Sequence, residues 1–263
     1  MKLRLLQIIA SAGLLTAGLN AQQQTANYLT VACVKAAPGK SAEYRQFVSD
    51  TSKKIAEVRV KSGEIVSWSF ARTIMPAGDE ARCDYTIATA SEGVPPQPDT
   101  AALGKSLDQA GVKMNATQYV AKRNSLSHLV AMEMWRPRVR VGQLQKGNYF
   151  FVNHMRVHDY AEYVKFETEV WRPLAEEWIK DGSQAGWRFN TLLLPSGTDV
   201  KYTALSVDIY PTWDAVFKQR STQETFKKVH PGKDYNQVLG GMGKLRDLAR
   251  RDLMYAEEVV TKK

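Results

Sequence analysis

Residues 42–47 read Ala-Glu-Tyr-Arg-Gln-Phe and residues 161–166 read Ala-Glu-Tyr-Val-Lys-Phe, so four of six residues recur after 119 positions. The other pairs at this offset are Ala56-Glu57 and Ala175-Glu176, Gly63 and Gly182, Trp68 and Trp187, Phe70 and Phe189, and residues 75–78 and 194–197. One constant offset over about forty residues marks the unit of folding. The sequence therefore predicts two copies of one structural unit in a single chain.

Each copy begins with a strand followed by a helix. The expected first strands, 28–35 and 149–156, are nearly continuous apolar runs, which is typical of a sheet covered on both faces. Ser41 and Asp159 precede the amphipathic stretches that contain the repeated motif, and both are good helix N-caps because their side-chain oxygens accept free backbone amides. The order strand then helix is thus expected in both copies.

Two strands and a second helical region follow in each copy. The expected strands are 66–74 and 83–90 in the first copy, and 186–193 and 202–209 in the second. The helical regions are expected to run to about Met134 and about Leu253. Residues 135–141 and 255–261 read equally as a closing strand or as a helix tail, and the sequence leaves that choice open.

This element order is that of the ferredoxin-like split βαβ unit. With two such units in one chain, the sequence resembles the dimeric α/β-barrel superfamily, and most closely its NIPSNAP-like and antibiotic-biosynthesis-monooxygenase-like members. The resemblance implies an α+β fold in which two tandem ferredoxin-like βαββ(αβ) repeats pack as an intrachain dimeric α/β barrel. The superfamily includes cofactor-free oxygenases, haem-degrading enzymes, haem-binding relatives of chlorite dismutase and small isomerases, so the fold leaves the activity open.

The N-terminus predicts export. A basic start, an apolar run and a small residue before a glutamine-rich stretch are typical of a bacterial signal peptide over residues 1–21, although an uncleaved anchor stays open. Repeat 1 is then expected over 22–141, a linker over 142–148 and repeat 2 over 149–263. We expect a periplasmic or secreted protein with no membrane segment after cleavage.

The net charge of +9 falls to +7 when the predicted leader, with Lys2 and Arg4, is removed. The densest positive segment contains Arg136, Arg138 and Arg140 but few aromatic residues. No recognised nucleic-acid module is present, so the charge favours solubility and anionic ligands over a nucleic-acid partner.

Cys33 and Cys83 both lie in the first copy, and the second copy has Val152 and Tyr202 at the matching positions. Gaining two cysteines together favours a disulfide in an exported chain. Two buried free thiols acting as small apolar residues are the alternative, because neighbouring strands hold cysteines in awkward geometry.

His154 is the candidate catalytic residue. It stands where the first copy has Lys35, at the end of an apolar strand, and an imidazole there can act as an acid or base near neutral pH. It can also ligate haem iron. The alternative is that His154 has no functional role and is a histidine at the end of a strand, half exposed to solvent. Asn153 precedes it and is a candidate ligand-binding residue.

Other candidate ligand-binding residues are those in which the copies differ. Arg188 and Asn190 match Ser69 and Ala71, and alternation places them on the face opposite Trp187 and Phe189. Tyr202 offers a phenol from the following strand. Trp171 adds an aromatic side chain on the first helix of the second copy. The sequence does not decide whether this side chain lines an apolar pocket, belongs to the core or lies at an interface.

The sequence contains no motif for a metal, nucleotide or nucleophile site. His154 and His158 are four residues apart, or about 13 Å along a strand, too far to share one zinc. We therefore expect no metal and no resident cofactor, with haem as an alternative.

Three functions remain open. The leading hypothesis is an exported small-molecule-binding barrel, with a cofactor-independent oxygenase as its first candidate activity; the residues do not decide whether it is an enzyme. The second is a non-catalytic scaffold or partner-binding protein that forms oligomers through an aromatic surface around Trp135, Arg136 and Arg138. The third is haem binding through His154.

Overall fold

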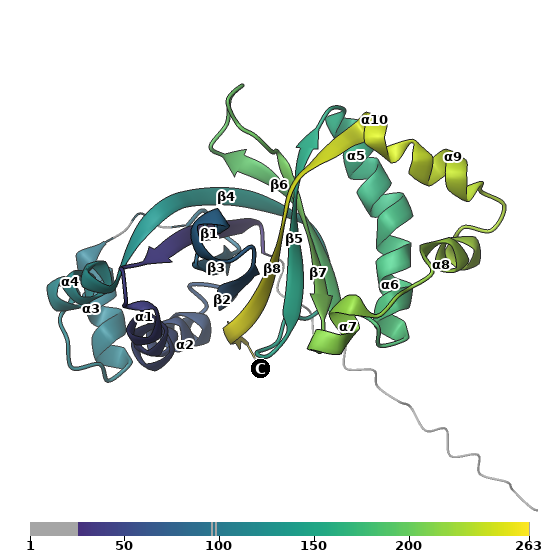
Figure 1. Ribbon diagram of the computed structural model, residues 1–263. Helices are drawn as coiled ribbons and strands as arrows, with labels where there is room; N and C mark the ends of the chain where they lie inside the picture. The colour runs from purple at the N-terminus through teal and green to yellow at the C-terminus, as the bar shows by residue number, and fades with distance from the viewer. Residues whose placement is uncertain (1–25, 96, 98, 263) are drawn as a thin grey trace, which may run out of the picture.

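Eight antiparallel strands form a closed barrel in the computed structural model, which describes residues 26–95, 97 and 99–262 (Figure 1). The predicted signal peptide lies outside these residues. The strands are β1 (Tyr28–Ala36), β2 (Ser67–Met75), β3 (Tyr85–Ser91), β4 (Ser127–Gly142), β5 (Tyr149–Val157), β6 (Gly186–Leu194), β7 (Ala204–Tyr210) and β8 (Arg246–Thr261). Their order around the barrel is β1-β3-β2-β8-β5-β7-β6-β4.

The helices lie outside the barrel in two groups, one for each half of the chain (Figure 1). The first group is α1 (Ser41–Phe47), the π-helical η1 (Val48–Ser52), α2 (Lys53–Ser62), α3 (Thr100–Gln109) and α4 (Ala116–Leu126), with a 3-10 turn η2 (Gly78–Glu80) between β2 and β3. The second group is α5 (Tyr160–Phe166), the π-helical η3 (Glu167–Trp171), α6 (Arg172–Lys180), α7 (Trp213–Phe217), α8 (Thr222–Val229), α9 (Tyr235–Gly240) and α10 (Met242–Leu245). The fold is therefore α+β.

The long strands β4 and β8 close the barrel. Strand β4 pairs with β1 in its own half and with β6 in the other half, while β8 pairs with β5 and with β2. Figure 1 shows both strands crossing between the two groups of helices. Residues 135–141 and 255–261, which the sequence left open, are thus strands.

The expected helix ends near Met134 and Leu253 are wrong. Helix α4 ends at Leu126 and α10 at Leu245, and each long strand starts at the next residue. The first residues of β4 pair with β1 and those of β8 pair with β5. Tertiary pairing therefore overrides the local preference.

Alternation along the strands separates an outer core from the barrel interior. On the outside, Trp68 and Phe70 pack beneath the first helices, and Trp187 and Phe189 pack beneath the second group. The interior is filled at one end by a separate apolar cluster of Ala71, Phe150, Ile209, Met254 and Ala256. Both faces of the strands are covered, in agreement with their apolar sequences.

Asp159 caps α5 as predicted, because its side chain accepts the Glu162 amide. Ser41 differs: it is the first residue of α1, and its hydroxyl hydrogen-bonds the Tyr85 hydroxyl at 2.7 Å. The turn between β4 and β5 begins at Gly142, which has a positive φ of 65°. A Cβ there would lie 2.3 Å from the Ala185 carbonyl oxygen, so only glycine fits this contact.

Candidate functional site

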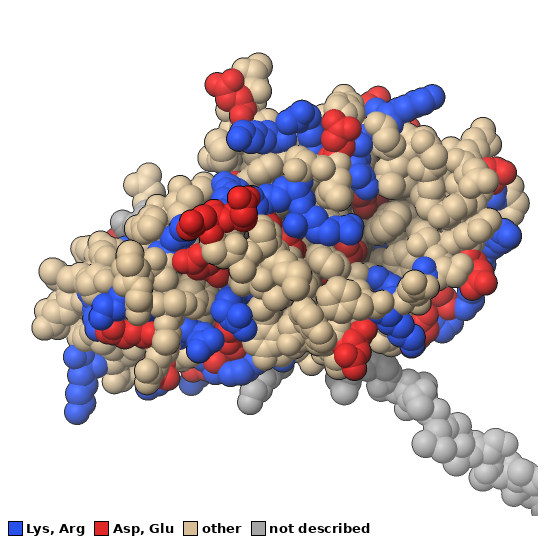
Figure 2. All heavy atoms as spheres, viewed as in Figure 1, with Lys and Arg blue, Asp and Glu red and all other residues tan. Residues whose placement is uncertain are grey.

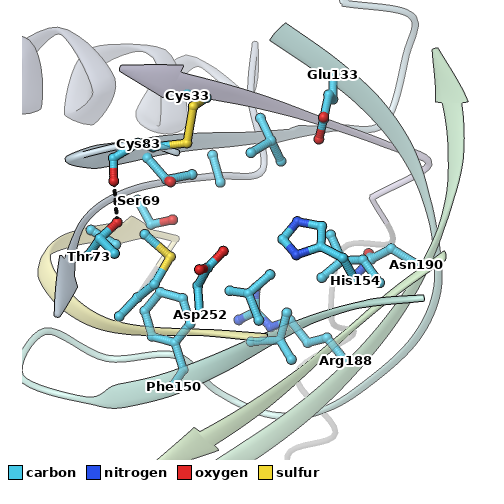
Figure 3. Close-up of a pocket in the computed structure, with 18 of the residues that line it drawn as sticks. Cys33, Ser69, Thr73, Cys83, Glu133, Phe150, His154, Arg188, Asn190 and Asp252 are labelled. Carbon is cyan, nitrogen blue, oxygen red and sulfur yellow. Dashed lines mark hydrogen bonds between the residues drawn. A yellow bond between two sulfur atoms is a disulfide. The ribbon is translucent and has the colours of Figure 1, made fainter. Parts of the chain in front are cut away.

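The barrel encloses a cavity of about 120 Å³ (Figure 3). All eight strands contribute, because every second residue of each strand points inward. Most of the wall is apolar, and its larger side chains are Leu29, Val31, Leu144, Phe150, Val152, Leu205, Val207, Ile209 and Met254. A mostly apolar cavity with a few polar groups is the usual form of a small-molecule site.

Two carboxylates reach the cavity, and each is paired with an arginine. Glu133 on β4 accepts a hydrogen bond from Arg82 at 2.9 Å. Asp252 on β8 accepts from Nε of Arg250 at 2.8 Å. The two acids are 119 residues apart in sequence, so the repeat offset relates them. Each acid is largely neutralised by its own partner.

Tyr202 extends the Glu133 pair toward His154. Its hydroxyl donates to Glu133 at 2.5 Å and also contacts Arg82. Its ring stacks on Trp135 with centroids 6.1 Å apart and lies 4.5 Å from the His154 ring. Burial raises the pKa of Tyr202 and the neighbouring Glu133 raises it further, so the phenol keeps its proton at neutral pH.

His154 projects from β5 into the cavity, with Glu133 and Asp252 on different sides of it (Figure 3). Its side chain is 8% exposed, and Nδ1 has no hydrogen-bond partner among the described residues. Burial lowers the pKa of His154 to about 4, although the charges of Asp252 and Glu133 oppose that shift. The imidazole is therefore neutral at pH 7.

Arg188 and Asn190 line the cavity from β6. Nε of Arg188 and Nδ2 of Asn190 are both buried and without a hydrogen-bond partner in the described part of the chain. Burial and, to a smaller extent, the nearby Arg140 lower the pKa of Arg188 to about 9, so the group is still a cation at pH 7. Buried donors usually have partners, and these two belong to side chains that line the cavity.

The strand register explains why these groups meet. His154 lies opposite Leu205 on β7, and Leu205 lies opposite Asn190 on β6. In the next row Val152, Val207 and Arg188 face one another in the same way. Arg188 and Asn190 thus lie on the face opposite Trp187 and Phe189, as alternation predicts.

Asn153 and Trp171 do not reach this cavity. Asn153 follows Val152 and so points to the opposite face, where it bonds Asp208 at 2.8 Å and accepts from Arg251 at 2.6 Å. Trp171 ends η3 in the helix layer and packs edge-on against Trp178. The structure therefore groups His154, Arg188, Asn190 and Tyr202, and separates Asn153 and Trp171 from them.

Sequence reasoning missed Glu133, Asp252 and their two arginines. Glu133 and Asp252 lie in the regions that the sequence predicts as helix, whereas the structure places them on β4 and β8, where alternation directs them into the barrel. The available signal was the repeat offset itself, since Glu133 and Asp252 occupy matching positions 119 residues apart.

The predicted contact surface around Trp135 is wrong. Trp135 has no exposed surface, because it stacks on Tyr202 inside the molecule. Arg138 bonds Tyr160 at 2.6 Å and Thr191 at 3.0 Å. Figure 2 shows basic and acidic side chains interspersed on the face in view, without one continuous basic patch.

Cys33 and Cys83 form a disulfide in the cavity wall, with their Cα atoms 5.2 Å apart. The described residues contain no group of three or more His, Cys, Asp or Glu side chains that could hold a metal ion. Within the same part of the chain, no helix has the length and apolar character needed to span a membrane.

Known structures share this fold. A candidate monooxygenase from Lactobacillus acidophilus aligns with a TM-score of 0.55 and 13% identity, over 90% of this chain and 97% of its own. A candidate monooxygenase from Fusobacterium nucleatum aligns with a TM-score of 0.53 and 12% identity, over 91% of this chain and 96% of its own. No family model matches the chain, and no curated protein is similar to it in sequence. At such identities the similarity concerns the fold.

Proposed function

We propose that the barrel interior binds a small molecule and that His154, Arg188 and Asn190 orient it. One observation carries this proposal: the three side chains line the same cavity, and each has a buried nitrogen that lacks a hydrogen-bond partner among the described residues. A buried polar atom without a partner costs about 1–3 kcal/mol. A ligand with matching polar atoms removes that cost, and this gives the site its binding energy and its specificity.

The size of the cavity limits the ligand. An engineered apolar protein cavity of roughly 150 Å³ binds benzene, and this cavity measures about 120 Å³. The expected ligand therefore has an apolar body of about one six-membered ring, with one or two polar groups directed at β6 and at His154.

A fragment screen by ligand-observed NMR tests the proposal. Val207 lines the cavity, so Val207→Phe fills it and is expected to abolish binding of single-ring fragments. Val94→Phe is the matched control, because Val94 lies in a loop and is 71% exposed. Fragments that bind both variants equally well would contradict binding in the barrel.

For the chemistry, we propose an oxygenation that needs no metal, with His154 as the general base. With a single-ring phenol as substrate, one oxygen atom of O2 enters the ring to give a quinone and the other leaves as water. All the electrons come from the substrate, so a substrate proton must first be removed to form the phenolate. The neutral imidazole can accept that proton, and the charges of Asp252 and Glu133 favour the imidazolium more strongly than Arg82 and Arg250 oppose it. The fold shared with candidate monooxygenases supports this choice over other proton-transfer reactions.

Oxygen uptake measured with a panel of single-ring phenols tests the reaction. His154→Gln is expected to lower the rate by roughly 10²–10⁴-fold, the usual contribution of a general base. His128→Gln is the control, because His128 is exposed on β4. A panel without any oxygen uptake, or equal rates in both variants, would rule out the oxygenase and leave ligand binding standing.

Haem does not fit the cavity. Pockets for drug-sized ligands occupy about 300–1,000 Å³, whereas this cavity measures about 120 Å³ and is surrounded by the eight strands. His154 would be the iron ligand, yet a porphyrin needs the barrel to open. A haem titration that leaves the Soret band of free haem unchanged is the expected result.

We further propose that the chain arose by duplication of a ferredoxin-like unit and belongs with the dimeric α/β barrels close to NIPSNAP-like and antibiotic-biosynthesis-monooxygenase-like proteins. Both halves begin with the same order of strands and helices, which supports a duplication. The disulfide supports export to the periplasm or medium. N-terminal sequencing of protein secreted by a bacterial host tests the predicted cut after Ala21.

A further inference from the structure

The charges around the cavity do not balance. Five charged side chains line it: Arg82, Glu133, Arg188, Arg250 and Asp252. Two acids against three arginines leave one positive charge, since His154 is neutral. The acids are engaged by Arg82 and Arg250, so the excess charge belongs to Arg188.

No other group among the described residues compensates the positive charge of Arg188. It forms no hydrogen bond or ion pair within the described residues, and the charge that acts on it most is another cation, Arg140. Arg140 lies directly opposite on β4, so both side chains leave the sheet on the same face. Like charges in directly opposite positions destabilise a sheet, and burial makes an unpaired charge more costly still.

We propose that the ligand is a small organic monocarboxylate, held by its carboxylate at Arg188 and Asn190 with Arg140 behind them; this inference rests on the proposed function. A guanidinium binds a carboxylate through two parallel N–H···O bonds, and the amide of Asn190 adds a third donor. The remaining wall is apolar and the cavity has room for about one ring. One carboxylate therefore satisfies the polar groups on β6, and the body of the ligand lies toward Phe150 and Val207.

Benzoate is the probe, and nitrobenzene is its neutral counterpart of the same shape. Their dissociation constants are measured by calorimetry and by methyl NMR shifts of Met254 and Leu205, which line the cavity. We expect benzoate to bind the purified protein at least about tenfold more tightly than nitrobenzene, the usual contribution of charged hydrogen bonds. Sodium chloride should weaken benzoate binding little, because buried pairs are poorly screened.

Arg188→Met is expected to remove this preference while nitrobenzene still binds. The variant should also melt at a higher temperature than the wild type without ligand, because it removes an unpaired buried charge. Arg136→Met is the matched control: Arg136 lies on the same strand as Arg140 but is exposed, and its variant should bind both probes like the wild type.

The outcomes separate this inference from the proposed function. If both probes bind with similar affinity, or if Arg188→Met keeps the preference for benzoate, the carboxylate site is refuted and the cavity remains a binding site. If neither probe shifts the Met254 and Leu205 methyl signals, the cavity takes no single-ring ligand, and both proposals are overturned.

Discussion

His154 should make the protein less stable in acid by a predictable amount. The unfolded chain binds a proton at this residue near pH 6.5, while the folded protein binds it only near pH 4. Between these values the unfolded state carries more protons, so the free energy of unfolding falls as the pH falls. The difference of about 2.5 pKa units corresponds to about 3 kcal/mol, lost between pH 7 and pH 4. The residue is 8% exposed, so solvent screening is small.

Urea unfolding followed by tryptophan fluorescence at pH 7 and pH 4 measures this loss. His154→Gln cannot take up the proton and is expected to lose about 3 kcal/mol less than the wild type over this interval. The acidic groups titrate in both proteins and cancel in the comparison. His128→Gln is the control, because an exposed histidine should leave the profile unchanged.

A direct titration completes the test. The chain has four histidines, so their ring signals can be resolved and assigned by NMR. A His154 signal that titrates near pH 6.5, or a His154→Gln variant with the same acid loss as the wild type, would refute the neutral buried imidazole on which the proposed chemistry depends.

Three further predictions concern other parts of the fold. Burial raises the pKa of Glu167 to about 7, so this carboxyl contributes about 3 kcal/mol of stability that is lost as the pH rises from 4.5 to 7, opposite in sign to the contribution of His154; the difference between the wild type and Glu167→Gln in urea titrations measures it. Gly142→Ala should lower the melting temperature well below that of Gly147→Ala, because both glycines have positive φ but only Gly142 is crowded. Reducing the Cys33–Cys83 bond should destabilise the wild type by about 2–4 kcal/mol, and a Cys33→Ser/Cys83→Ser variant should melt equally with and without reductant.

The repeat offset predicted most of the barrel wall. It located the first three strands of each half to within a few residues, because continuous apolar runs and paired turns mark them clearly. It could not predict β4 and β8, since one of the two pairing partners of each strand comes from the other half of the chain. Such long-range pairing leaves little local pattern in the sequence.

The same distinction applies to the site. Arg188 and Asn190 can be predicted as site residues from the sequence because both lie on one strand with a clear alternation. The matching positions of the first half hold Ser69 and Ala71, so the two halves differ at these positions. Asn153 was grouped with His154 by adjacency, yet neighbours on a strand point to opposite faces. The two arginine–carboxylate pairs depend on β4 and β8 and could not be found without the barrel.

The two halves contribute unequally to the cavity. Each supplies one acid with its own arginine, but the unpartnered groups Arg188 and Asn190 belong to the second half alone, and Ser69 and Ala71 form the matching part of the first-half wall. A barrel with two equal halves would hold a ligand in two equivalent orientations. In the proposed complex, Arg188 and Asn190 hold the polar end of the ligand, so its other end always meets the same wall. Holding a reactant in a single orientation next to a neutral imidazole is the arrangement that a proton transfer requires.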